Sequence, residues 1–200
     1  MCFSAGASFA ASGVLAVAGG VTLKKMREKR MLPIALVPLI FAVQQFAEGI
    51  QWMSDKSGLV SAVAGYFFLF LAFSFWPVYI PFAIFLVEKN YRRKRFIQLC
   101  IMIGAVVGIL GLAFLIAKPL SVIEASRHIE YIIAIPLGLG ILPYLFAIVG
   151  SCFASSYKII RWLGGLIIVF LPISWWISSS AFGSIWCFFA AVLSGIIYFF

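Results

Sequence analysis

Apolar runs long enough to cross a membrane alternate with short polar breaks along nearly the whole chain. A helix needs about 20 apolar residues to cross the hydrocarbon core of a bilayer, and it pairs its own backbone groups there. The pattern therefore predicts an all-α, polytopic bundle of seven transmembrane helices, forming one domain over residues 1–200. The expected spans are about residues 3–23, 32–53, 59–87, 96–117, 131–153, 161–177 and 184–200.

The connection before the fifth span has a different pattern. After Pro119, which suits the first turn of a helix, Glu124, Arg127, His128 and Tyr131 recur at helical spacing. We expect a short amphipathic helix at the outer membrane interface, or an outward extension of the fifth span.

Prolines and glycines mark two further spans. Trp76-Pro77 and Pro81 lie in the third span, and each proline removes a backbone donor, so we expect a bend in its inner half. Gly104 and Gly108 in the fourth span have the small-xxx-small spacing that lets helices pack closely.

The charges give the predicted bundle a direction. The chain is 64% hydrophobic and 10% charged, whereas about a quarter of the residues in a soluble domain are charged. Twelve of its fifteen Lys and Arg residues fall in the connections 24–30, 89–95 and 158–161. By the positive-inside rule, the N-terminus lies outside and the C-terminus in the cytoplasm. Because the net charge of +9 is confined to connections, we expect a lipid bilayer as partner and no nucleic acid.

Glu48 is the candidate functional residue with the strongest physical argument. An ionisable group inside a span costs roughly 2–4 kcal/mol unless it is paired or faces water. Gln44, Glu48 and Gln51 share one helix face, with Trp52 beside them. We predict an outward-facing polar pocket lined by these four residues and His128. Glu48 is then either a proton-titrating or cation-binding carboxylate, or an acid held in a structural hydrogen-bond network.

Four residues expected near the outer face have side chains that bind transition metals: Cys2, Glu48, His128 and Cys187. Their spacing matches no known metal motif, and His128 has the alternative role of an interfacial hydrogen-bonding residue. Cys2 and Cys187 are either free thiols or a disulfide that joins the first span to the last.

Two residue groups near the inner side are expected to be structural. Cys100 and Cys152 are small apolar side chains suited to packing. Glu88, beside Lys89 and Arg92, is expected to form a surface salt bridge.

Four features of the sequence are distinctive: MCFSAGASF at the start, SIWCFFAA in the last span, and the dipeptides Glu48-Gly49 and Trp76-Pro77. Together they resemble a family of bacterial integral membrane proteins of unknown function. The resemblance implies location in the bacterial inner (plasma) membrane. It also implies that Cys2, Glu48, His128 and Cys187 belong to family-defining stretches.

Three functions are compatible with this pattern. The first is binding or transport of a small solute or cation in an outward-facing pocket around Glu48. The second is a membrane enzyme that depends on a metal or a thiol, with Cys2 or Cys187 in the reaction. The third is an accessory or structural subunit without a small-molecule site, whose basic loops face lipid or a partner.

Overall fold

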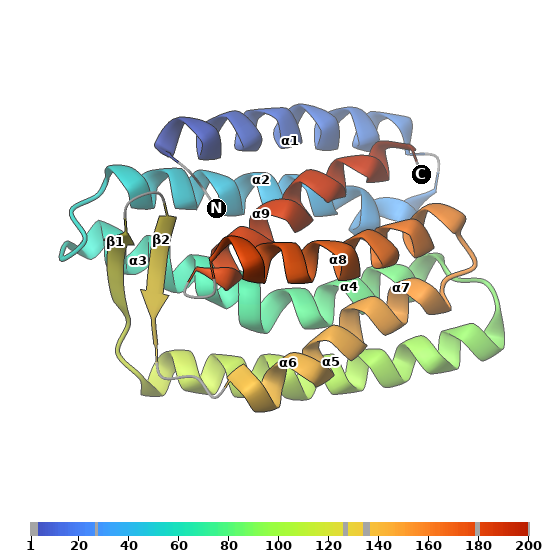
Figure 1. The fold of residues 1–200 in the computed structure, drawn as a ribbon. Coiled ribbons are helices and arrows are strands. Elements are labelled where there is room, and N and C mark those ends of the chain that lie inside the picture. Colours follow the sequence, from blue (N-terminus) through green and yellow to red (C-terminus); the bar gives the residue numbers. More distant parts are fainter. Residues whose placement is uncertain (1–3, 27, 126–127, 134–136, 179–180, 200) are drawn as a thin grey trace.

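The computed structural model describes residues 4–26, 28–125, 128–133, 137–178 and 181–199. This part of the chain is mostly helical, with one two-stranded sheet after the fourth long apolar helical stretch (Figure 1). The elements before the sheet are α1 (Ala5–Lys25), η1 (Lys29–Met31), α2 (Leu32–Met53), α3 (Leu59–Leu69), η2 (Phe70–Phe75), α4 (Trp76–Val87) and α5 (Tyr91–Ala117). The others are β1 (Ser121–Ala125), β2 (His128–Ile132), α6 (Leu137–Leu145), η3 (Phe146–Gly150), α7 (Ser151–Ala154), α8 (Lys158–Ile177), α9 (Phe182–Ser194) and η4 (Gly195–Phe199).

Five of the helical stretches are long and apolar enough to cross a membrane: Ala5–Lys25, Lys29–Met53, Leu59–Val87, Tyr91–Ala117 and Lys158–Ile177. They indicate a membrane protein, as the hydrophobic pattern predicted. Two further apolar helices, Gly140–Ala154 and Phe182–Tyr198, are shorter. At about 1.5 Å per residue they reach roughly 25 Å, against about 30 Å for the hydrocarbon core. The count of seven spans and the orientation therefore stay predictions.

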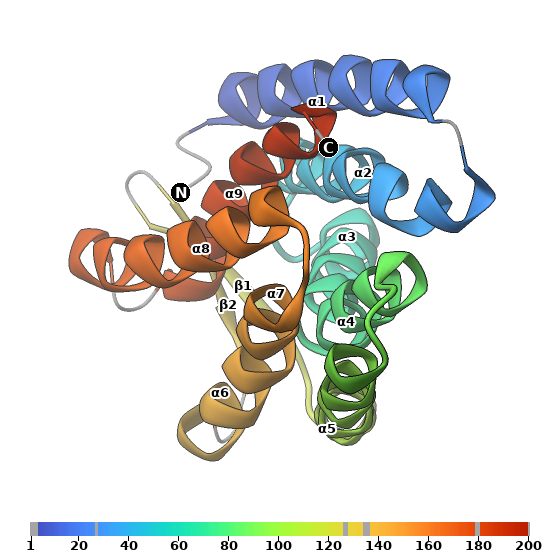
Figure 2. The same ribbon diagram turned by 90° about the vertical axis from the view of Figure 1, so that its right-hand side faces the viewer.

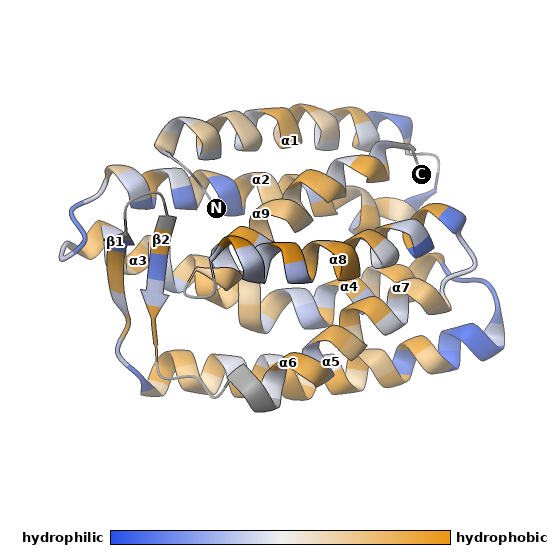
Figure 3. Ribbon diagram, in the orientation of Figure 1, coloured by the Kyte–Doolittle hydropathy of each residue, from blue (hydrophilic) through white to orange (hydrophobic). Residues whose placement is uncertain are grey.

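Successive helical passes alternate in direction (Figure 1). The three basic connections consequently meet at one end of the bundle, and the hairpin of β1 and β2 lies at the other. Figure 2 shows α9 between α1 and α8, and α9 packs against both α8 and α2. Hydrophobic residues dominate the middle of the bundle, whereas hydrophilic residues gather near its ends (Figure 3). The buried core lies mainly on α2 and on the α3–α4 pass.

The expected amphipathic helix after Pro119 is wrong, because this stretch forms an antiparallel hairpin. Val122 pairs with Tyr131 and Glu124 with Ile129 across β1 and β2. The β-branched residues Val122, Ile123, Ile129 and Ile132 favour strands, and their preference outweighed the helical spacing of the polar residues. The fifth expected span also begins later, since residues 131 and 132 belong to β2 and helix α6 starts at Leu137.

The hairpin packs onto the ends of α2 and α3. Ile129 is fully buried, and the Tyr131 ring stacks on Phe68 with their centroids 4.9 Å apart. Lys56 forms a 3.1 Å ion pair with Glu124 of β1. The same ammonium group donates to three backbone carbonyls at the end of α2 (Gln51, Trp52 and Ser54). Lys56 thus links the hairpin to the helix that carries Glu48.

The Trp76-Pro77 step is accompanied by a π-helical segment, η2. The Trp76 N–H bonds to the Leu71 carbonyl, five residues back. The next bond of that pattern would join residue 77 to Ala72, but Pro77 has no N–H. The Tyr144 hydroxyl of α6 donates to the Ala72 carbonyl instead, at 2.9 Å. The irregular segment therefore connects α6 to the third pass.

The glycines of α5 confirm the expected close packing. A Cβ on Gly104 would lie 1.9 Å from the Pro77 carbonyl oxygen, and one on Gly108 would lie 2.6 Å from the Ser74 carbonyl oxygen. Pro81 cannot donate to the Pro77 carbonyl, so this acceptor faces the glycine surface of α5. Contacts between Cα–H groups and carbonyls are typical of such interfaces.

Candidate functional site

The polar face predicted on α2 lies inside the bundle. Gln44, Gln45, Glu48 and Gln51 are all fully buried. Toward the start of α2 the same face continues with the buried apolar residue Phe41. The sequence spacing correctly grouped Gln44, Glu48 and Gln51, because residues three and four apart lie on one side of a helix.

Three side-chain hydrogen bonds join this face to three other helices. The Ser184 hydroxyl of α9 donates to Glu48 Oε1. Gln51 Nε2 donates to the Ser61 hydroxyl of α3. Trp76 Nε1 of α4 donates to Gln44 Oε1 at 2.7 Å. We call these six residues (Gln44, Glu48, Gln51, Ser61, Trp76 and Ser184) the α2 polar cluster.

The α2 polar cluster has more hydrogen-bonding capacity than these bonds use. Gln51 Oε1 has no hydrogen-bond partner within the part of the chain that the structure describes, and the indole N–H of Trp52 has none there either. Leaving such a buried group unpaired costs about 1–3 kcal/mol. Gln51 of the cluster can therefore accept a hydrogen bond from a polar molecule, and the neighbouring Trp52 can donate one.

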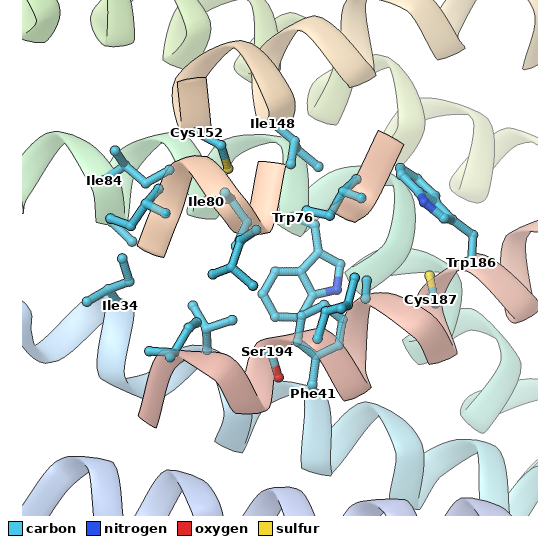
Figure 4. A pocket seen from close by; sticks show the side chains of 18 of the residues that line it. Ile34, Phe41, Trp76, Ile80, Ile84, Ile148, Cys152, Trp186, Cys187 and Ser194 are labelled. Atoms are coloured by element: carbon cyan, nitrogen blue, oxygen red, sulfur yellow. The ribbon is translucent and has the colours of Figure 1, made fainter. Parts of the chain in front are cut away.

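An apolar cavity of about 80 Å³ adjoins the cluster. Trp76 lines this cavity with its ring while its N–H reaches Gln44. The Trp76 ring stacks on Phe41 with centroids 3.9 Å apart, in the centre of Figure 4, and Cys187 and Trp186 stand at one end. Cys187 lies one helical turn from Ser184, so the cavity and the Glu48 carboxylate share the same face of α9.

Two of the four predicted metal ligands have described side chains. Glu48 and Cys187 both face the interior, and Cys187 carries a free thiol. His128 belongs to β2, where it pairs with Ala125, but its side chain lies outside the described residues, as does Cys2. Among the side chains that are described, no three His, Cys, Asp or Glu residues gather at one point. The four-residue metal site stays a prediction.

The predicted outward-facing pocket is closed in this structure. Glu48 and Gln51 are fully buried, and Trp52 is partly exposed. The hairpin and Lys56 cover the end of α2 beyond them. Sequence reasoning did not identify Ser61 and Ser184 as partners of this face, because a serine in an apolar span gives no signal of which helix it will meet.

Glu88 forms a second buried carboxylate site at the opposite end of the bundle. It is 2% exposed, so the expected surface salt bridge is wrong. Its oxygens accept from the backbone N–H groups of Lys89, Asn90 and Ser156 and from the Ser156 hydroxyl. Burial raises the pKa of Glu88, but the bonds from Asn90, Ser156 and Lys89 together outweigh burial and hold the pKa below its ordinary value.

Two arginines complete the junction around Glu88. Arg93 donates to the carbonyls of Ala154 and Ser155, and Arg161 donates to those of Ser155 and Ser156. Carbonyls at the end of a helix have no hydrogen-bond donor within that helix, so the two arginines supply the donors for the carbonyls at the end of α7. The junction fastens the α4–α5 connection to the α7–α8 connection, and its role is structural.

No curated protein and no solved structure matches the chain. A family of unknown function, DUF6629, matches over residues 1–200. With its apolar helical bundle, the chain therefore belongs to the family of unknown function DUF6629, in agreement with the resemblance to an uncharacterised family.

Proposed function

We propose that this protein binds, and carries across a bacterial plasma membrane, a small solute or cation at the α2 polar cluster. The bundle crosses the membrane seven times, with the N-terminus outside and the C-terminus in the cytoplasm. The meeting of the three basic connections at one end of the bundle supports this orientation. The hairpin end, where Glu48 lies, then faces outward.

The observation that carries the proposal is the fully buried Glu48 carboxyl group, bonded to Ser184 of another helix beside a cavity. Helix packing in a membrane relies on small residues, van der Waals contact and hydrogen bonds between neutral polar side chains, so stability alone does not call for an acid at this depth. Intramembrane acids typically mark the pathways of ions, protons and substrates. A ligand at this position would meet carboxylate, amide and hydroxyl groups on one side and aromatic rings on the other.

Binding from outside requires the covered end of α2 to open. Lys56 holds the hairpin there through Glu124 and through the carbonyls that end α2. Movement of the hairpin away from α3 would expose Gln51 first and Glu48 about one turn deeper. This route places the acid within reach of a small hydrated solute.

Thermal unfolding of the purified protein tests the proposal. The wild-type protein is screened in detergent against sodium, potassium, magnesium and zinc ions and a panel of small polar solutes. A ligand present at 100 times its Kd stabilises the folded state by about 2.7 kcal/mol. We expect at least one compound to raise the unfolding midpoint and the effect to disappear in Glu48→Gln.

Glu88→Gln is the matched control, because it neutralises the other buried carboxylate, at the opposite end of the bundle. This variant should keep the full ligand-induced shift even if its baseline midpoint is lower. Equal loss of the shift in both variants, or no shift with any compound in the wild type, would contradict a solute site at Glu48.

A further inference from the structure

A second candidate site lies at the inner end of the bundle, where the basic connections meet (Figure 1). An open groove of about 520 Å³ runs between the start of α5 and the η3–α7 segment. Its residues are Arg92, Arg93, Phe96, Gly150, Phe153 and Ala154. The two arginines lie at the start of α5, next to the polar connection. The two phenylalanines lie on facing helices, Phe96 on α5 and Phe153 on α7.

The cations of this stretch are not equivalent. Arg93 is held by the carbonyls that end α7. Lys94 lies 4.4 Å from the ring centre of Phe85, and Arg95 lies 4.7 Å from that of Tyr91. Arg92 is exposed and makes no such contact within the described ranges. Its guanidinium is free to bind an anion at the mouth of the groove.

The walls of the groove are apolar and accessible. Phe96 is 41% exposed and Phe153 is 47% exposed. Gly150 also lines the groove, and an added Cβ there would meet only ordinary contacts, the nearest being Cys100 Sγ at 3.5 Å. The groove therefore offers an apolar slot lined by two phenylalanines and bordered by an exposed cation.

We propose that this groove binds one anionic phospholipid. Its phosphate pairs with Arg92, assisted by the fixed charge of Arg93, and its acyl chain lies between Phe96 and Phe153. Basic pockets between transmembrane helices on the cytoplasmic side bind anionic headgroups in this way. The apolar walls favour a lipid over free phosphate, which would gain nothing from two exposed phenylalanines. The bound lipid would bridge α5 and α7 beside the Glu88 junction.

Native mass spectrometry tests the proposal on the full-length protein. Delipidated protein in detergent is mixed with equal amounts of phosphatidylglycerol and phosphatidylcholine that carry identical acyl chains. We expect one phosphatidylglycerol to be retained in preference. Arg92→Gln should lower that preference about fivefold, the factor that corresponds to about 1 kcal/mol per cation near an anionic surface.

Two further variants separate charge from shape. Lys24→Gln removes the same charge from a different basic connection and should leave the preference unchanged. Gly150→Leu keeps every charge but fills the slot, and should reduce retention of both lipids. Equal effects of Arg92→Gln and Lys24→Gln, or unaltered retention in Gly150→Leu, would overturn the proposal. Displacement of the lipid by inorganic phosphate alone would overturn it too, by showing an anion site that needs no acyl chain.

Discussion

Alanine at Gly104 should destabilise the bundle strongly, although the change adds a single methyl group. The added Cβ would lie 1.9 Å from the Pro77 carbonyl oxygen and 2.7 Å from the carbonyl carbon. Both neighbours are backbone atoms, so no side chain can rotate away. Ordinary contact begins at about 3.4 Å, so α5 and α4 must separate by about 1.5 Å.

The same substitution elsewhere gives a graded series. At Gly108 the nearest atom is the Ser74 carbonyl oxygen at 2.6 Å, and at Gly13 of α1 nothing lies within 4 Å. Overpacking typically costs 1–3 kcal/mol and sometimes more. We expect about 3 kcal/mol for Gly104→Ala and about 1–2 kcal/mol for Gly108→Ala. Gly13→Ala should be neutral or slightly stabilising, because alanine has the higher helix propensity.

Thiol-reactive fluorescence during heating provides the assay. Cys100, Cys152 and Cys187 are free and buried, so their reaction with a dye reports unfolding. For a chain of this size each kcal/mol shifts the midpoint by about 2–4 °C. Gly104→Ala should therefore lower the midpoint by about 6–12 °C. Equal midpoints for Gly104→Ala and Gly13→Ala would refute the reasoning that backbone contact at residue 104 sets the distance between α4 and α5.

Three other changes probe the two ends and the centre of the bundle. Because the pKa of Glu88 is lowered on folding, its stabilising contribution is complete above the ordinary pKa of 4.5 and is lost as the pH falls through the lowered value. Glu88→Gln should lower the free energy of unfolding by about 2 kcal/mol at neutral pH and weaken the fall of the unfolding midpoint at acid pH. If the midpoint of the variant falls with acid as much as that of the wild type, the buried bonds to Ser156 are contradicted. Trp76→Phe leaves Gln44 Oε1 without its donor and should destabilise the protein by about 1–3 kcal/mol. The same change should cost less in a protein that already carries Gln44→Leu, and equal costs in thermal unfolding would argue against this bond. Lys56→Met should accelerate hydrogen exchange in the hairpin and at the end of α2, while amides in α5 keep their rates. Unaltered exchange in the hairpin would show that Lys56 does not hold the hairpin in place.

The sequence predicted much of the fold because lipid imposes a simple rule on it. The expected second and third spans, residues 32–53 and 59–87, have the ends that the structure gives to α2 and to the continuous α3–α4 stretch. Long apolar runs in a membrane must be helical, since an unpaired backbone is too costly there. The hairpin was missed because its polar residues repeat at helical intervals, whereas the β-branched residues beside them favour strands and the chain follows that preference.

Helical periodicity is a local property, so the sequence alone was enough to place Gln44, Glu48 and Gln51 on one face. It also determined which loops carry positive charge. The folded bundle was needed to show that Ser184, 136 residues away, meets Glu48, and that Glu88 is buried against Ser156. These pairings depend on which helices pack together and at what rotation, and packing arises from side-chain shapes along whole interfaces. The sequence around a single serine in an apolar run therefore does not indicate which residue of another helix it will contact.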